Sequence, residues 1–292
     1  LRDSSGPVRW LPLDHGTPDA AARLAAGAIG CDAIVHCAAL SSPWGARADF
    51  ERANVQGTRE VVQAALQAGV RRLVHVSTPS LYFAFRDALD IRESDPLPPP
   101  VNHYARTKRA AEAVVRGSAV PEVVLLRPRA LFGPWDRTLM PRLLRAMAAG
   151  PLPLMRGGRA QLDLTCVDNA VDAVWLALTR PLPRPGAVYN VSNGDPRPLS
   201  ELLERMAAAF GLSLRTRPVP WPLVSATARA LEWRARLGGG AEPPWTRYSA
   251  GVLAFSQTLN LDAIRADLGY RPAVPLDEGL QRHAHWWRAQ QP

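Results

Sequence analysis

The chain has 292 residues, of which 47% are apolar and 21% charged, as in ordinary globular proteins, so extensive disorder is excluded. It contains no run of about 18 uncharged apolar residues, so we predict no stable membrane insertion. The formal net charge is +9, but the arginines are scattered and no basic run exceeds a pair, so we predict no nucleic acid partner.

Three cysteines, Cys31, Cys37 and Cys166, lack the spacing of metal ligands. An odd number of cysteines in apolar segments is typical of reduced, structural thiols. We therefore predict a cytoplasmic protein without a metal site.

The first half of the chain alternates short apolar runs with amphipathic stretches. The apolar runs, which are typical of strands buried on both faces, span residues 8–14, 32–39, 71–78 and 122–131. The amphipathic stretches span 17–28, 49–69 and 103–117, and Thr17 and Pro18 suit the start of the first one. This alternation predicts an α/β fold with a doubly wound parallel sheet, of the Rossmann type. Ligands bind at the carboxyl ends of the strands in such sheets.

The composition changes after Gly133. Proline and arginine become frequent, and residues 135–150 and 221–239 read as amphipathic helices joined by Pro/Gly loops. We predict a first domain with the parallel sheet over residues 1–133, to which the resemblance given below assigns NAD(P) binding, and a smaller substrate lobe over 134–292, with 161–193 returning to the first domain.

The lone lysine of the chain, Lys108, follows Tyr104 by four residues on a predicted helix. This spacing places the two side chains on one face, a turn apart. An ammonium group beside a phenol stabilises the phenolate and lowers its pKa, which brings the tyrosine closer to the pH at which acid–base catalysis is efficient. The spacing therefore predicts Tyr104 and Lys108 as catalytic residues.

Hydroxyl side chains lie at the end of the apolar run at 71–78 and just after it. Thr78 and Ser80 lie at the carboxyl end of a predicted buried strand, where Tyr104 would also arrive. A hydroxyl there could donate to a carbonyl oxygen and hold it beside the tyrosine. We predict Thr78 as the catalytic hydroxyl, with Ser80 as the alternative; the other reading is that both satisfy loop backbone groups.

Several segments, taken in order, resemble the extended short-chain dehydrogenase/reductase superfamily, in the branch of NAD-dependent epimerase/dehydratases and 3β-hydroxysteroid dehydrogenases. They are NVQGT (54–58), VSTPSLYF (76–83), YARTK (104–108), LRPRALFGP (126–134), VDNAVDAV (167–174) and LGYRPAVPLDEGL (268–280). The resemblance implies a catalytic set of Thr78, Tyr104 and Lys108. In that set the tyrosine exchanges a proton with the substrate oxygen and the lysine also holds the nicotinamide ribose.

The resemblance further implies NAD or NADP as cofactor. The implied cofactor-binding residues are Asp14, His15, Cys37, Ala38, Ala39, Leu40, Asn54, Tyr104, Lys108 and Pro128, and the implied substrate-pocket residues are Ser41, Ser80 and Arg129. Asp14 is also open to reading as an ordinary loop residue after a strand.

One feature of the superfamily is missing from the sequence. The family begins with a strand and a glycine-rich turn, GxxGxxG, that lets a helix N-terminus approach the pyrophosphate. The early glycines here, Gly6, Gly16, Gly27 and Gly30, have the wrong spacing. We therefore expect an N-terminally incomplete piece of a chain roughly 40 to 60 residues longer.

The substrate is predicted from two stretches of the second half. Nucleotide-sugar enzymes of this superfamily carry an arginine for the diphosphate where this chain has Leu162, and losing that partner argues against a sugar nucleotide. Residues 219–245 are rich in tryptophan and proline and suit an apolar, steroid-like or alkyl β-keto or β-hydroxy compound.

We therefore predict an NAD(P)-dependent oxidoreductase that interconverts a secondary alcohol and a ketone of a small-molecule substrate. The alternatives are a nucleotide-sugar epimerase or dehydratase with tightly bound NAD, and a non-catalytic Rossmann redox sensor or scaffold. The sequence leaves a homodimer open.

Overall fold

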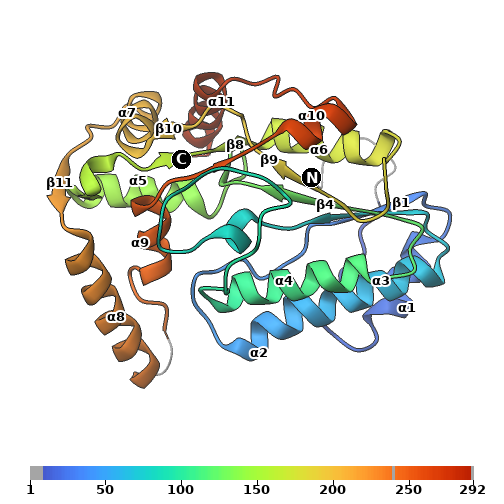
Figure 1. Cartoon of the computed structure of the whole chain (residues 1–292). Coiled ribbons are helices and arrows are strands. Elements are labelled where there is room, and N and C mark those ends of the chain that lie inside the picture. The colour runs from blue at the N-terminus through green and yellow to red at the C-terminus, as the bar shows by residue number, and fades with distance from the viewer. Residues whose placement is uncertain (1–8, 239–240, 291–292) are drawn as a thin grey trace.

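Four parallel strands form the central sheet in the computed structural model, which describes residues 9–238 and 241–290 (Figure 1). The strands run in the order β1 (Ala33–His36), β2 (Arg72–Val76), β4 (Glu122–Pro128) and β9 (Ala187–Val191). Val74 of β2 pairs with Val35 on one side and Val124 on the other, so the carboxyl ends of the strands meet at one edge. The predicted α/β class with a parallel sheet is confirmed.

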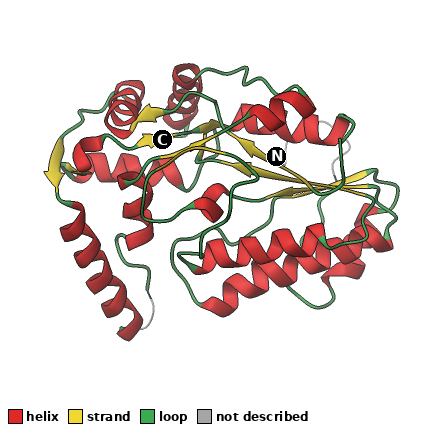
Figure 2. Ribbon diagram, in the orientation of Figure 1, coloured by secondary structure: helices red, strands yellow, loops and turns green. Residues whose placement is uncertain are grey.

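Helices cover both faces of this sheet (Figure 2). On one face lie α1 (Ala20–Ala28), α3 (Gly57–Gln67) and α4 (His103–Arg116), packed through a cluster of valine, alanine and leucine side chains. On the other lie α6 (Val167–Thr179) and α10 (Asp262–Leu268), packed through a second cluster. Because both faces are covered, the inner strands β2 and β4 are almost fully buried and read as near-continuous apolar runs in the sequence, whereas Val35 of β1 at the sheet edge is exposed.

The predicted strand at 8–14 is wrong for its described residues, 9–14, which form no strand. Pro12 lies in the middle of this segment and has no N–H to donate to a ladder. The carbonyl of Pro12 instead accepts a hydrogen bond from the Arg23 side chain of α1. Val8 lies outside the described residues.

The helix predicted to start at Thr17 begins later, at Ala20. Asp19 is its N-cap and makes no side-chain cap hydrogen bond, while the Thr17 hydroxyl donates to the Asp14 carbonyl at 2.9 Å. Thr17 therefore closes a turn before the helix instead of capping it, because a threonine hydroxyl bonds a nearby carbonyl as readily as a helix N–H.

The predicted helix at 49–69 is divided into three segments. They are α2 (Arg47–Phe50), the π-helical η1 (Glu51–Gln56) and α3. Single turns of π-helix inside α-helices are frequent at functional sites. This one carries Asn54, a residue predicted to contact the cofactor.

The second half of the chain adds shorter elements around its own apolar cluster. Its helical segments are α5 (Leu139–Ala149), η3 (Arg156–Gly158), α7 (Leu199–Phe210), α8 (Trp221–Leu237), α9 (Arg247–Ala254) and α11 (Leu276–Ala289), and the 3₁₀ segment η2 (Pro79–Tyr82) precedes them in the chain. α5 and α8 occupy the predicted helical stretches at 135–150 and 221–239. None of the described helices has the length and hydropathy needed to cross a bilayer.

Short strands complete the fold. One sheet contains β10 (Arg197–Pro198), β7 (Gln161–Leu162), β12 (Gln257–Leu259) and β3 (Ala88–Ile91), and two strand pairs join β11 (Thr216–Val219) to β6 (Leu152–Met155) and β5 (Leu131–Phe132) to β8 (Thr165–Cys166). β9 and α6 belong to the central sheet and its cover although they follow Gly133 in the chain. The division at residue 133 stays a prediction.

A buried ion pair fixes α4 on the sheet. Glu112 of α4 is 1% exposed and accepts two hydrogen bonds from the guanidinium of Arg127 in β4, at 2.8 and 2.6 Å. The Ser77 hydroxyl, just after β2, donates to the same carboxylate at 2.5 Å. Bidentate, charge-assisted pairs of this kind are geometrically specific. The pair therefore sets how α4 lies against the ends of β2 and β4.

We predict that Glu112→Gln lowers the free energy of unfolding by about 3–5 kcal/mol, because it leaves the Arg127 charge buried without its counter-charge. Urea unfolding curves measure this. The control is Glu278→Gln, which removes an exposed pair with Arg282 and should cost less than about 1 kcal/mol. Equal effects of the two variants would show that the buried pair does not anchor α4.

Candidate active site

Tyr104 and Lys108 lie in the first two turns of α4, at the edge of the sheet where the strands end. Asn102 caps this helix, since its side-chain oxygen accepts a hydrogen bond from the Ala105 N–H at 2.8 Å. An asparagine N-cap in extended conformation starts the helix at a defined residue. The cap therefore fixes the position of Tyr104 relative to the end of β2.

Lys108 is only 2% exposed and points at β2. Its Nζ donates to the Val76 carbonyl at 2.7 Å and lies 3.3 Å from Nε2 of His75. Burial lowers the pKa of this amine to about 8, and the Glu112 carboxylate opposes the shift. An ammonium has three donors, so one remains for a further partner beside the two on β2.

Tyr104 makes hydrogen bonds with two hydroxyl groups, those of Ser41 and Thr78. Ser41 comes from the loop that follows β1, and Thr78 is the N-cap of η2, directly after β2. Two segments of the chain thus bring hydroxyl groups to one phenol oxygen, and Thr78 is the residue for which the strand-end argument predicted this.

The predicted electrostatic effect of Lys108 on Tyr104 is wrong in this structure. Burial raises the pKa of Tyr104, and the hydrogen bonds from Ser41 and Thr78 only partly oppose it. The ammonium that was predicted to lower this pKa is directed at the Val76 carbonyl and His75. The spacing of Tyr104 and Lys108 along the helix predicts that they share a face, but it does not determine where the Lys108 amine points.

Tyr248 of α9 adds a further hydroxyl group to this polar cluster. The sequence did not predict it as a site residue. Thr78 donates to Ser80 at 3.0 Å, and the Ser80 and Tyr248 oxygens lie 2.7 Å apart. The Thr246–Ser249 capping box sets the start of α9 and could have located the helix. Nothing in the local pattern pairs this tyrosine with Ser80, because the contact joins two distant segments.

Aromatic rings surround Tyr248. Phe83 meets it edge-to-face with centroids 5.5 Å apart, and Phe83 contacts Phe85 at 5.2 Å. Phe85 stacks with Trp221 of α8, which also contacts Phe255. The hydroxyl cluster therefore borders an aromatic wall. Phe83 and Phe85 follow η2, Trp221 begins α8, and Phe255 follows α9.

Asn54 holds the loop after β1 in place. It is 1% exposed, and its side chain accepts from the Leu40 N–H at 2.7 Å and donates to the Leu40 carbonyl at 3.2 Å. Its amide also donates to Thr107 of α4 at 3.0 Å. Asn54 thus ties the predicted cofactor loop, residues 37–40, to the helix of Tyr104.

The remaining predicted cofactor residues lie on the side of β1. Cys37, Ala38 and His15 line a hollow of about 700 Å³ between β1, α1 and residues 9–15. The Nε2 of His15 also donates to the Ala53 carbonyl of η1 at 3.0 Å. Its ring occupies the space that a Cβ on Gly57 would need, so only glycine fits there.

Asp14 lies apart from this hollow and is already paired. One carboxylate oxygen accepts from the Gly16 N–H at 2.9 Å, and the other accepts from Arg52 at 2.6 Å. The Gly16 hydrogen bond, followed by that of Arg52, lowers the pKa of Asp14. An aspartate in a local turn is the alternative reading that the sequence left open.

Pro128 and Arg129 lie at the carboxyl end of β4, as Thr78 and Ser80 lie just after the carboxyl end of β2. Pro128 is the last residue of the strand, and Arg129 continues beside β9, with its N–H donating to the Val191 carbonyl at 3.0 Å. Arg129 is 8% exposed, and its charge acts on Tyr248. The predicted substrate-pocket residues Ser41, Ser80 and Arg129 are therefore all linked to the tyrosine cluster.

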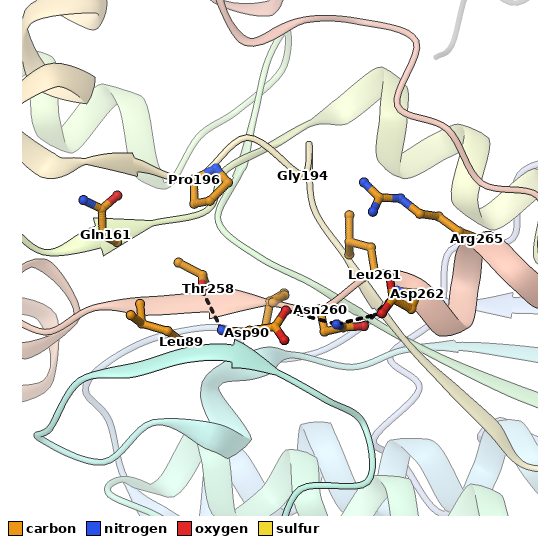
Figure 3. Close-up of a pocket in the computed structure, with 11 residues that line it drawn as sticks. Leu89, Asp90, Gln161, Gly194, Pro196, Thr258, Asn260, Leu261, Asp262 and Arg265 are labelled. Atoms are coloured by element: carbon orange, nitrogen blue, oxygen red, sulfur yellow. Dashed lines mark hydrogen bonds between the residues drawn. The ribbon is translucent and has the colours of Figure 1, made fainter.

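A separate surface pocket of about 420 Å³ lies between β3, β12 and residues 194–196 (Figure 3). Thr258 accepts from the Asp90 N–H there, and Asn260 contacts Asp90 and Asp262. None of the predicted site residues is among those that line it.

The geometry fits one end of a dinucleotide. Lys108 has a free donor beside the exposed loop 37–40, and Tyr104 lies on the same helix, which suits a nicotinamide ribose. Among the described residues, no glycine-rich turn lies along the hollow at His15 and Cys37. The residues present therefore fit the nicotinamide end of the cofactor.

Comparison with known proteins gives consistent results. A family model described as the NAD dependent epimerase/dehydratase family matches residues 2–192. A 2-alkyl-3-oxoalkanoate reductase of Stenotrophomonas maltophilia is 34% identical over 264 residues, which cover 87% of this chain and 79% of the relative. A 3beta-hydroxysteroid-dehydrogenase/decarboxylase of Arabidopsis thaliana is 30% identical over 295 residues, covering 95% and 66%.

Among solved structures, the chain is similar to a dTDP-glucose 4,6-dehydratase of Streptomyces venezuelae, crystallised with NAD. The TM-score is 0.75 at 27% sequence identity, and the match covers 99% of this chain and 82% of that one.

We predict that the Lys108 side chain titrates with a midpoint at about pH 8. The amine is the sole lysine amine of the chain, so labelling with ¹³C-lysine gives one ε-carbon signal to follow by NMR. The side chain is a cation below this pH and neutral above it, so ionic contacts of Lys108 weaken as the pH rises through 8. A midpoint near 10.5 would contradict the burial of the amine.

Proposed function

Because this chain belongs to the NAD dependent epimerase/dehydratase family and is an NAD(P)-dependent oxidoreductase of the extended short-chain dehydrogenase/reductase type, we propose that it interconverts a secondary alcohol and a ketone on a largely apolar substrate. The match over residues 2–192 confirms the family predicted from the order of the sequence motifs. The cofactor prediction, NAD or NADP, is confirmed with it.

The observation that carries the proposal is the phenol of Tyr104, hydrogen-bonded to Ser41 and Thr78 one turn from the buried Lys108. In ketone reduction Tyr104 donates its proton to the carbonyl oxygen as the carbonyl carbon receives a hydride. The nicotinamide, when bound, supplies that hydride or accepts it in the reverse direction. Thr78 and Ser41 hold the carbonyl oxygen of the substrate in place, and the remaining donor of Lys108 holds the nicotinamide ribose.

Burial raises the pKa of Tyr104, so the phenol stays protonated at neutral pH. A buried, neutral phenol carries its proton at neutral pH and can donate it. Positive charge brought close to the phenol would stabilise the tyrosinate left behind.

The aromatic wall supports an apolar substrate. Phe83, Phe85, Trp221 and Phe255 offer ring faces and edges beside the Ser80–Tyr248 hydroxyl pair. The names of the two relatives, a 2-alkyl-3-oxoalkanoate reductase and a 3beta-hydroxysteroid-dehydrogenase/decarboxylase, describe chemistry at a keto or a hydroxyl group.

The alternative function, on a nucleotide sugar, is favoured by the similarity to the dTDP-glucose dehydratase. Against it, Leu162 occupies the position where such enzymes carry an arginine for the diphosphate, and this leucine is buried in the apolar cluster of the second half. The non-catalytic alternative is not retained, because the family and the relatives are enzymes.

We predict that Tyr104→Phe lowers the rate of ketone reduction by at least about 100-fold while cofactor affinity changes little, because it removes the proton donor and keeps the ring. Steady-state assays with aliphatic 3-ketones and NADH or NADPH, together with cofactor titration by fluorescence, measure both quantities. The matched control, Tyr189→Phe, removes a hydroxyl that contacts Asp267 away from the cluster and should retain activity. Normal turnover by Tyr104→Phe would refute the proposed mechanism, and turnover of dTDP-glucose in place of ketones would favour the alternative function.

A further inference from the structure

The guanidinium of Arg129 is buried without a counter-charge. The residue is 8% exposed, and its Nε has no hydrogen-bond partner. Among the described residues, no carboxylate forms an ion pair with Arg129 and no group accepts a hydrogen bond from its side chain. Buried arginines elsewhere in the chain are paired, as Arg127 is with Glu112.

The surroundings of Arg129 hold this charge in place without neutralising it. Its backbone is fixed by hydrogen bonds, with the N–H donating to Val191 and the carbonyl accepting from the Thr165 hydroxyl at 2.5 Å. Asp163 attracts the guanidinium from a distance, but its two oxygens accept from Ser192 and the Leu259 N–H. Burial lowers the pKa of Arg129, which reflects the free-energy cost of a buried unpaired cation.

Arg129 is linked to the active-site cluster by the effect of its charge on Tyr248. Its charge acts on the Tyr248 phenol, which hydrogen-bonds to Ser80, and Ser80 is joined to Thr78. Thr78 contacts Tyr104, and Tyr104 in turn acts on Tyr248. The charge of the unpaired guanidinium therefore acts on the same Tyr248 phenol as the proton donor Tyr104.

We propose that Arg129 binds a carboxylate of the substrate, so that the enzyme acts on 3-oxo or 3-hydroxy carboxylic acids with apolar chains. This inference rests on the proposed function and names its substrate class. A guanidinium fork matches a carboxylate with two parallel hydrogen bonds. In such acids the carboxylate is separated from the reacting carbon by a single carbon, which suits a cation beside the same hydroxyl cluster as Tyr104.

The charge count favours a carboxylate over a diphosphate. One unpaired guanidinium balances one negative charge, and the two other arginines near the cluster are engaged. Arg127 is paired with Glu112, and Arg247 lies over the Phe85 ring at 3.7 Å with its Nε donating to Ser225. The name of one relative, a 2-alkyl-3-oxoalkanoate reductase, describes a substrate with this pair of groups.

The test compares an acid with its uncharged ester on the wild type and on Arg129→Met, which keeps the length of the side chain and removes its charge. The probes are 3-hydroxydodecanoate and its methyl ester, oxidised with NAD⁺ or NADP⁺. We expect Arg129→Met to lower kcat/KM for the acid about 100-fold and that for the ester less than about 3-fold. Arg129→Lys should recover part of the activity on the acid, since it restores the charge without the fork.

A binding measurement separates this inference from the proposed function. Calorimetric titration of the same acid and ester, without turnover, should show that only the acid loses affinity in Arg129→Met. If the acid binds in an Arg129-dependent way but no alcohol or ketone is turned over, the proposed function fails and carboxylate binding stands. If the wild type binds acid and ester equally, or Arg129→Met impairs both equally, Arg129 serves the structure or Tyr248 and the inference is overturned.

Two controls guard against loss of the fold. Arg116→Met, at the exposed far end of α4, should leave both activities unchanged. Thermal unfolding of Arg129→Met should occur at or above the wild-type temperature, because removing an unpaired buried charge relieves its cost. A marked drop in Tm would instead assign Arg129 a structural role and contradict the proposal.

Discussion

The bidentate ion pair between Glu112 and Arg127 is the contact on which the arrangement of the active site depends. It joins the middle of α4 to β4, while Ser77 adds the end of β2 to the same carboxylate. Tyr104 and Lys108 lie on the same helix as Glu112, so their positions follow from where this carboxylate is held. Buried pairs contribute little net stability but fix one arrangement, and here that arrangement places a phenol at the strand ends.

The two buried arginines of one short segment illustrate opposite uses of the same side chain. Arg127 neutralises a carboxylate of the protein, whereas Arg129, two residues later, has no partner for its Nε and is attracted by Asp163 only from a distance. Proteins tolerate an unpaired buried charge where function requires it and the rest of the fold is stable enough. At the end of β4, Arg127 therefore anchors α4, and Arg129 adds a positive charge to the site.

The sequence predicted the parts of this structure that depend on local pattern. The strands at 71–78 and 122–131 read correctly because both of their faces are covered, and the apolar run at 32–39 also forms a strand. Thr78 lies beside Tyr104 because parallel strands end at one edge. It failed at 9–14, where Pro12 removes a ladder donor, and at the pKa of Tyr104. That pKa depends on burial and on the direction of one amine, which spacing along a helix does not determine. Tyr248 was missed because its partner Ser80 lies in a distant segment.

The contact between the Ser80 and Tyr248 hydroxyls also has a consequence for which residues of the site can change independently. α8 and α9 meet the rest of the site through side chains: Tyr248 with Ser80, Trp221 with Phe85, and Arg236 over the ring of Trp44. No described backbone ladder joins these two helices to the central sheet. Substitutions confined to this late segment can therefore reshape the wall that a substrate meets while the proton donor on α4 is inherited unchanged.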